Sequence, residues 1–167
     1  LYSQEEHVVS DKQVLVYRDD MNTSTLEDIT KLSPSEFISL SDISYFDNSK
    51  THWAFFQLNN PTTETFEFII EGGNNAKETY YFIKDGQTTT KKTGYFFPAT
   101  ERDITHNYET KVKLVLPPET TVKAYVKIES PDNLPVDISF NLIPEAEWRK
   151  SLSKSTLFEG VFSGVLT

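Results

Sequence analysis

The stretch Val122-Lys123-Ala124-Tyr125-Val126-Lys127-Ile128 decides the fold class of this chain. Its aliphatic residues stand at every second position, and two lysines and a tyrosine fill the positions between them. Successive side chains of a β-strand point to opposite faces, so this pattern predicts a strand with one buried face and one face toward solvent. By the same alternation, Tyr125 is expected on the exposed face, beside Lys123 and Lys127.

Similar short runs lie on both sides of this stretch. Alternating or two-sided apolar runs occur in residues 14–17, 53–58, 66–70, 80–83, 112–116 and 136–142. The segments between them contain turn residues, and Asp85-Gly86 between two β-prone runs predicts a hairpin. Since 53–58 is apolar on both faces, we expect it to be a central strand. This many short strands predict an all-β fold, a jelly-roll-like β-sandwich.

Two segments are predicted to be helical. Ser24 and Thr25 are followed by the acidic residues Glu27 and Asp28, which resembles an N-cap that opens a short helix through Ile29. After Pro144, acidic residues precede basic ones, an order that suits the dipole of a helix. We therefore expect residues 1–143 to form the sandwich and residues 144–167 to form a helical connector.

The last residues, 157–167, are apolar and contain two glycines. We expect them to be the first turns of a membrane helix in a longer protein. The alternative is an amphipathic tail that packs on the domain. No stretch of the chain reaches the roughly 18 apolar residues of a complete membrane span.

The composition limits the chemistry of this chain. Its 167 residues include 16 Lys+Arg and 25 Asp+Glu, a net charge of -9, and no cysteine. A negative field repels phosphate backbones, so nucleic acid is not expected as a partner. The three histidines lack metal-binding spacing, and we expect no cofactor and no metal site. Asp19-Asp20-Met21-Asn22 is expected to be a solvated acidic turn, with a structural Ca²⁺ site as the alternative.

No motif of a known catalytic site is present in the sequence. There is no Gly-x-Ser-x-Gly, no glycine-rich phosphate loop and no dinucleotide fingerprint. Glu101 and Asp103 flank Arg102 in a polar segment, where we expect solvated charges rather than the paired carboxylates of a glycosidase. No catalytic residue is therefore predicted.

Aromatic residues are the most informative candidates for binding, because sugars stack on flat rings and hydrogen-bond to amides and charged groups. Trp53, Phe55 and Gln57 share one face of the predicted central strand, whose other face is also apolar. If that other face lies in the core, the first face is either an open outer surface or is covered by a loop. We predict that the ligand-binding residues are Trp53, Phe55, Gln57, Arg102 and Tyr125.

The order of several short segments carries a resemblance. The run Trp53-Ala54-Phe55-Phe56-Gln57-Leu58-Asn59-Asn60 is preceded by Leu26-Glu27-Asp28-Ile29 and Phe37, and it is followed by Asp85-Gly86, Thr93-Gly94, Arg102, His106 and Leu114-Val115-Leu116-Pro117. Together with the apolar tail 157–167, this order resembles the type 2 extracellular domain of seven-transmembrane receptors with diverse intracellular signalling modules. The resemblance extends from Val14 to the C-terminus.

The resemblance implies a periplasmic β-sandwich similar to carbohydrate-binding modules, on the outer side of the bacterial inner membrane. It also implies a following seven-helix membrane region and a cytoplasmic output, such as a histidine kinase of a two-component system or a diguanylate cyclase. The family has an arginine where this chain has Phe55, and Gly-Asp where it has Gly94-Tyr95. We therefore expect ligand contacts that differ from those of the family pattern.

Three functions remain open. The first, which we prefer, is a ligand-sensing module for a carbohydrate or a similar small molecule. The second is a protein-interaction or homodimerisation module without a small ligand. The third is an enzyme on a jelly-roll scaffold, which would need two convergent carboxylates. A groove with a few polar groups favours the first function, and a large flat apolar patch favours the second.

Overall fold

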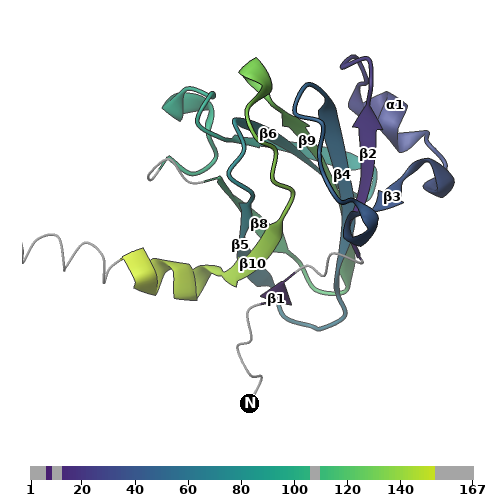
Figure 1. Ribbon diagram of the computed structural model, residues 1–167. Helices are drawn as coiled ribbons and strands as arrows, with labels where there is room; N and C mark the ends of the chain where they lie inside the picture. Colours follow the sequence, from purple (N-terminus) through teal and green to yellow (C-terminus); the bar gives the residue numbers. More distant parts are fainter. Residues whose placement is uncertain (1–6, 9–12, 106–109, 153–167) are drawn as a thin grey trace, which may run out of the picture.

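Two antiparallel β-sheets pack face to face in the computed structural model, which describes residues 7–8, 13–105 and 110–152 (Figure 1). The small sheet has the order β1 (His7–Val8), β10 (Phe140–Pro144), β5 (Phe66–Gly72) and β8 (Lys111–Leu116). The large sheet has the order β3 (Ile38–Ser39), β2 (Leu15–Asp19), β4 (Thr51–Asn60), β9 (Thr120–Glu129), β6 (Lys77–Lys84) and β7 (Gln87–Thr93). The predicted all-β sandwich is confirmed.

The stretch 122–128 lies in β9, in the interior of the large sheet. β9 pairs with β4 on one side and with β6 on the other. β4 in turn lies between β2 and β9, which confirms the prediction of a central strand for 53–58. Since both neighbours of β4 and β9 supply hydrogen bonds, these two strands form the rigid centre of the large sheet.

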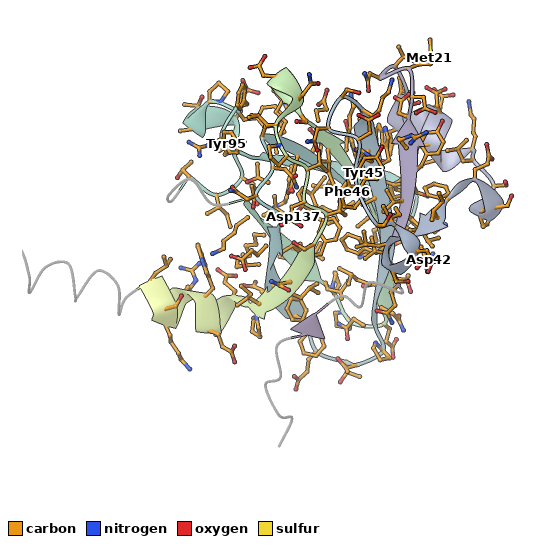
Figure 2. All side chains as sticks on the ribbon, viewed as in Figure 1. Met21, Asp42, Tyr45, Phe46, Tyr95 and Asp137 are labelled. Carbon is orange, nitrogen blue, oxygen red and sulfur yellow. The ribbon has the colours of Figure 1, made fainter. Side chains whose placement is uncertain are left out.

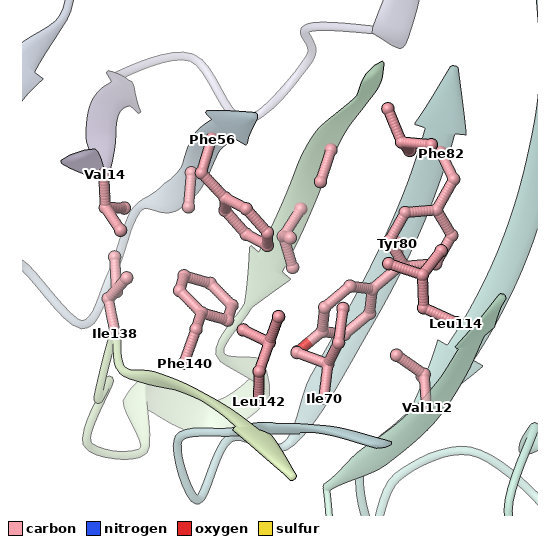
Figure 3. Packing of buried hydrophobic residues seen from close by; sticks show 14 of the residues in the cluster. Val14, Phe56, Ile70, Tyr80, Phe82, Val112, Leu114, Ile138, Phe140 and Leu142 are labelled. Atoms are coloured by element: carbon pink, nitrogen blue, oxygen red, sulfur yellow. The ribbon is translucent and has the colours of Figure 1, made fainter. Parts of the chain in front are cut away.

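The main core fills the space between the two sheets (Figure 3). Phe56 and Tyr80 of the large sheet contact Phe140 of the small sheet, with ring centroids 4.8 Å and 6.2 Å apart. Other buried members of this core are Val14, Val16, Leu40, Ala54, Ile70, Phe82, Val112, Leu114, Leu116, Val122, Ala124, Val126, Ile128, Ile138 and Leu142. The alternate residues of β4 and β9 therefore face inward, as their pattern predicts.

The predicted hairpin joins β6 to β7 through Asp85 and Gly86. The φ angles of these two residues are 50° and 76°. Two consecutive positive φ angles define the type I′ turn, whose twist matches that of the strands on either side. Lys84 pairs with Gln87 directly across this turn, so the hairpin prediction is confirmed.

The last strand is shorter than its sequence pattern predicts. β10 begins at Phe140, although the alternation begins at Val136 and buries Ile138 as well. The backbone N–H of Val136 donates to Asn48 Oδ1 (3.2 Å), and that of Asp137 donates to Asn75 Oδ1 (2.9 Å). These donors bind loop side chains instead of a neighbouring strand, so the segment is extended but unpaired.

The helical segments lie outside the two sheets. Of the two residues predicted for the cap, Ser24 and Thr25, it is Thr25 that forms the N-cap of α1 (Leu26–Thr30). Short 3₁₀ turns occur at η2 (Pro34–Glu36), η3 (Leu40–Asp42), η4 (Ala99–Glu101) and η5 (Pro131–Asn133). Residues 145–152 form a helix that follows β10 without a loop and leads away from the sandwich (Figure 1). The tail 157–167, which we expect to begin a membrane helix, lies outside the described residues.

Candidate functional site

The outer face of the large sheet carries a row of aromatic rings at its centre. Phe55 of β4 and Tyr81 of β6 are both opposite Tyr125 of β9 in the register of the sheet. The ring centroids of Phe55 and Tyr125 are 4.8 Å apart, and Trp53 stacks on Tyr81 with centroids 5.9 Å apart. These residues alternate with the core residues of the same strands, so the pleat alone directs them outward.

This face is covered, which was one of the two alternatives for Trp53 and Phe55. Ile29 of α1 forms a second buried cluster with Trp53 and Tyr125. The partly buried hydrophobic residues around this cluster are Tyr17, Leu26, Leu32, Phe37, Phe55, Tyr81 and Ile83. The prediction that Tyr125 is exposed is wrong, because only 9% of its surface is accessible. Alternation tells which face a side chain is on, but not whether another element covers that face.

A hollow of about 230 Å³ remains where the segment from α1 to η2 meets the large sheet. We call it the aromatic hollow; its lining residues are Leu15, Ile29, Leu32, Pro34, Phe37, Phe55, Gln57, Lys123 and Tyr125. The rings of Phe37 and Phe55 lie with centroids 6.2 Å apart. The hollow therefore combines aromatic and aliphatic walls with a small number of polar groups, the usual composition of a small-molecule site.

Three of the five predicted binding residues meet at this hollow, namely Phe55, Gln57 and Tyr125. Trp53 is on the same face but is 1% exposed and does not line the hollow. Arg102 follows η4, in a different part of the chain, and does not line it either. The two outlying residues thus do not share a site with the other three.

Sequence reasoning missed the residues that cover the sheet. Leu26, Ile29 and Leu32 are spaced three apart, a stripe typical of one buried helix face. That signal predicts burial, but it does not reveal which surface the helix covers. Lys123 was expected on the outer face, and the structure adds that it pairs with Gln57 across β9 and β4.

The acidic residues near the hollow are engaged in local structure. Asp28 accepts hydrogen bonds from the hydroxyl and the backbone N–H of Thr25, which lower the pKa of its carboxyl group. Glu27 pairs with Lys31 at 2.6 Å, on the next turn of the helix. By contrast, burial raises the pKa of the Tyr125 hydroxyl, so this group is a neutral hydrogen-bond donor at physiological pH.

A larger hollow of about 440 Å³ lies between β7 and β8, at the open edge of the sandwich. Three lysines line it, and each has a carboxylate close by. Lys91 is 3.0 Å from Asp103, Lys113 is 2.5 Å from Glu145, and Lys84 is 4.0 Å from Asp85. Because its charges are already compensated and it contains none of the predicted binding residues, we prefer the smaller aromatic hollow as the site.

The connector helix is tied to the small sheet by charged groups. Glu145, its first residue, accepts from Lys113 Nζ of β8 and is also paired with Arg149 one turn further along. Lys113 reaches Glu67 of β5 as well, at 3.0 Å. Hydrogen bonds, first of all from Lys113, lower the pKa of Glu145 to about 2. Among the described residues, no helix has the length and apolar character needed to cross a membrane.

The acidic turn at the end of β2 is held by its own side chains. Asp19 accepts from the backbone N–H groups of Met21 (3.2 Å) and Ser24 (2.7 Å), and Asp20 pairs with Arg18 (2.7 Å). Within residues 7–8, 13–105 and 110–152, no three His, Cys, Asp or Glu side chains are grouped so that they could hold a metal ion. These contacts account for Asp19 and Asp20 by local hydrogen bonding.

Comparison with known families finds a family model that covers most of this chain. The family model described as 7TMR-DISM extracellular 2 matches residues 11–141, which include every strand except β1 and the last residues of β10. A search of curated proteins finds no match to this chain.

Proposed function

This chain belongs to the 7TMR-DISM extracellular 2 family, the extracytoplasmic sensor domains of membrane receptors, and from this premise we propose that it binds a carbohydrate or a similar small molecule in the aromatic hollow. The observation that carries the proposal is the meeting of Phe55, Gln57 and Tyr125 at one hollow. Flat rings supply stacking surface, and an amide with a hydroxyl supplies directed hydrogen bonds.

The position of α1 supports a sensing role. One wall of the hollow is the central pair β4 and β9, which is fixed by hydrogen bonds on both sides. The other wall comes from α1 and the segment that follows it as far as Phe37. Ile29, Leu32 and Phe37 attach this wall to the sheet through side-chain packing. A ligand that contacts both walls would favour the arrangement in which α1 lies against the sheet. It does so because a ligand shifts a conformational equilibrium by its differential affinity for the two conformations.

We further propose that the helix 145–152 belongs to a connector, residues 144–167, that leads to a membrane region. In this proposal the cytoplasmic output domain is a histidine kinase or a diguanylate cyclase. If it is a histidine kinase, the receptor belongs to a two-component system. Ligand binding would change the orientation of this connector relative to the sandwich. The homodimer that we considered from the sequence stays a prediction.

The exposed apolar residues favour a small ligand over a protein partner. Met21 and Tyr45 are 78% and 74% exposed, and Tyr95 is 38% exposed. Figure 2 shows these three residues well apart on the molecule. A protein-interaction site usually presents a contiguous apolar patch of several hundred Å². Met21, Tyr45 and Tyr95, three of the exposed large apolar side chains in the described part of the chain, do not gather into such a patch.

A thermal-shift screen of the 167-residue chain against mono- and oligosaccharides tests the proposal. A ligand at 100 times its Kd stabilises the folded state by about 2.7 kcal/mol, which corresponds to a rise in Tm of roughly 5–10 °C for a chain of this size. Gln57→Ala should abolish the rise. Thr88→Ala, a change at another exposed position of the large sheet, should leave it intact. Absence of any shift across the screen would contradict the proposal.

Trp53→Ala is unsuitable as a binding variant. Removing a fully buried large aromatic side chain costs about 3–5 kcal/mol. Loss of ligand binding in that variant would therefore report unfolding, whereas Gln57 is exposed and its replacement should change stability by less than about 0.5 kcal/mol.

A further inference from the structure

We propose that the ligand of the aromatic hollow is an acidic sugar, a single unit bearing a carboxylate, and that Lys123 and Gln57 bind this carboxylate. The inference rests on the proposed function and names the chemical class of its ligand. It depends on the charge of the lining, on the unused hydrogen-bonding capacity at one end of the hollow, and on its size.

The lining has a charge opposite to that of the protein. The whole chain has a net charge of -9, yet among the residues that the structure describes no Asp or Glu lines the aromatic hollow, and Lys123 is the one charged residue of its described lining. The carboxylates of α1 are occupied by Thr25 and Lys31, as described above. Glu36 of η2 accepts from the backbone N–H of Ser33 at 2.7 Å. An anion would therefore meet a locally positive site on an acidic surface.

Lys123 differs from the other described lysines in having no partner among the residues that the structure describes. Lys150 has an interaction of its own. Each of the others contacts a carboxylate, a backbone oxygen or an aromatic ring. These lysines are Lys31, Lys50, Lys77, Lys84, Lys91, Lys92, Lys111, Lys113 and Lys127. The side-chain amide of Gln57 likewise has no hydrogen-bond partner within the described part of the chain. Two adjacent polar groups of one hollow are thus available to a ligand.

The register of the sheet brings these two donors together. Gln57 and Lys123 are directly opposite each other on β4 and β9, so their Cβ atoms are about 4.5–5.5 Å apart. Phe55 and Tyr125 form the next outward-facing pair along the same two strands. A ring that stacks on this aromatic pair would place a carboxylate substituent near Lys123 and Gln57, where charge-assisted hydrogen bonds are stronger than neutral ones.

The volume of the hollow limits the size of the ligand. Sites for drug-sized molecules have volumes of about 300–1,000 Å³. At about 230 Å³, the aromatic hollow is smaller than that range and fits one sugar unit.

Matched pairs of ligands test the proposal by isothermal titration of the 167-residue chain. Glucuronate is compared with glucose, and galacturonate with galactose, at low and at high salt. We expect the acid of at least one pair to bind about tenfold or more tightly than its neutral partner, with a preference that weakens at high salt. Lys123→Gln should remove the preference, and Lys123→Arg should retain most of it.

Lys84→Gln is the matched control, since Lys84 also lies on the large sheet but lines the other hollow. Circular dichroism establishes that each variant is folded. If a neutral sugar binds and is lost in Gln57→Ala, while the ratio of acid to neutral affinity is near one and unchanged in Lys123→Gln, the acidic-ligand proposal is overturned and the proposed function stands. If neither acids nor neutral sugars bind, both are overturned.

Discussion

At the scale of single residues, the most unusual group is the carboxyl of Glu78. It is fully buried between the sheets, where Tyr80 Oη donates to it at 2.8 Å and Asn75 Nδ2 donates to it at 2.5 Å. Gly72 leaves room for it, because a Cβ at that position would lie 2.4 Å from Glu78 Oε2. Burial raises the pKa of Glu78 to about 8, and the nearby Asp137 acts in the same direction. The site is closed, so we assign it a structural role.

Because Glu78 is a buried acid with a raised pKa, we expect the free energy of unfolding to fall as pH rises. The folded state holds the Glu78 proton up to about pH 8, whereas the unfolded chain releases it near pH 4.5. Between these values the folded state binds more protons, so the free energy of unfolding decreases with pH. At about 1.36 kcal/mol per pKa unit, the loss amounts to a few kcal/mol.

Urea unfolding of the wild type and of Glu78→Gln at pH 5, 7 and 9 measures this effect. The amide keeps an acceptor and a donor but does not titrate, so the variant should lose much less stability from pH 5 to pH 9. Parallel pH profiles for the two proteins would show that Glu78 does not carry this proton.

At the scale of elements, α1 depends on its N-terminal cap. Thr25 Oγ1 accepts from the backbone N–H of Asp28, and Asp28 accepts in return from the N–H of Thr25 at 2.9 Å. A helix of five residues has few internal hydrogen bonds, so its stability comes from this capping box and from the burial of Ile29. Since α1 forms one wall of the aromatic hollow, the cap also positions the site.

Thr25→Ala should therefore destabilise the protein and weaken ligand binding together. Loss of an N-cap costs about 1 kcal/mol, and typically lies between about 0.5 and 2 kcal/mol. Thermal unfolding measures the first effect, and titration with the ligand found in the screen measures the second. Thr25→Ser, which keeps the hydroxyl, is the control. Unchanged affinity in a Thr25→Ala protein of lower Tm would show that α1 does not position the ligand.

At the scale of the whole molecule, the contacts of Lys113 join the small sheet to the connector helix. Lys113 Nζ bridges Glu67 of β5 and Glu145 of the helix, and its backbone N–H donates to Asp103 at 2.7 Å. Removing Lys113 would take away the counter-charge of Glu67 and would leave Glu145 paired with Arg149 of its own helix. The orientation of residues 145–152 relative to the sandwich is thus set by a small number of side chains.

Lys113→Met should loosen the connector without unfolding the sandwich. We expect faster amide hydrogen exchange in residues 145–152 and unchanged exchange in β4 and β9. Lys92→Met, which removes an ion pair with Glu101, is the control. Because the pKa of Glu145 is lowered to about 2, the bridge should persist at pH 5 and be lost only as pH falls from 4.5 toward 2. Equal exchange in the two variants would contradict this role.

The sequence by itself determined the sandwich and the inward faces of its strands. Alternation in 122–128 follows from the two-residue period of a strand, and the turn at Asp85-Gly86 follows from local backbone preferences. The cap of α1 was predictable to within one residue, Ser24 or Thr25, because a cap and the acidic residues that follow it are close together in sequence. These features depend on interactions between residues that are close in sequence, and such interactions can be predicted from the sequence pattern.

Only the tertiary structure decided what lies over the outer face of the large sheet. It buried Tyr125 and Trp53 beneath α1, kept Arg102 apart from the other candidates, and placed Lys123 beside Gln57. It also left Val136 and Ile138 outside β10, because loop side chains bind the neighbouring backbone. Each outcome depends on contacts between segments far apart in the chain, and such contacts leave no periodic signal in the sequence.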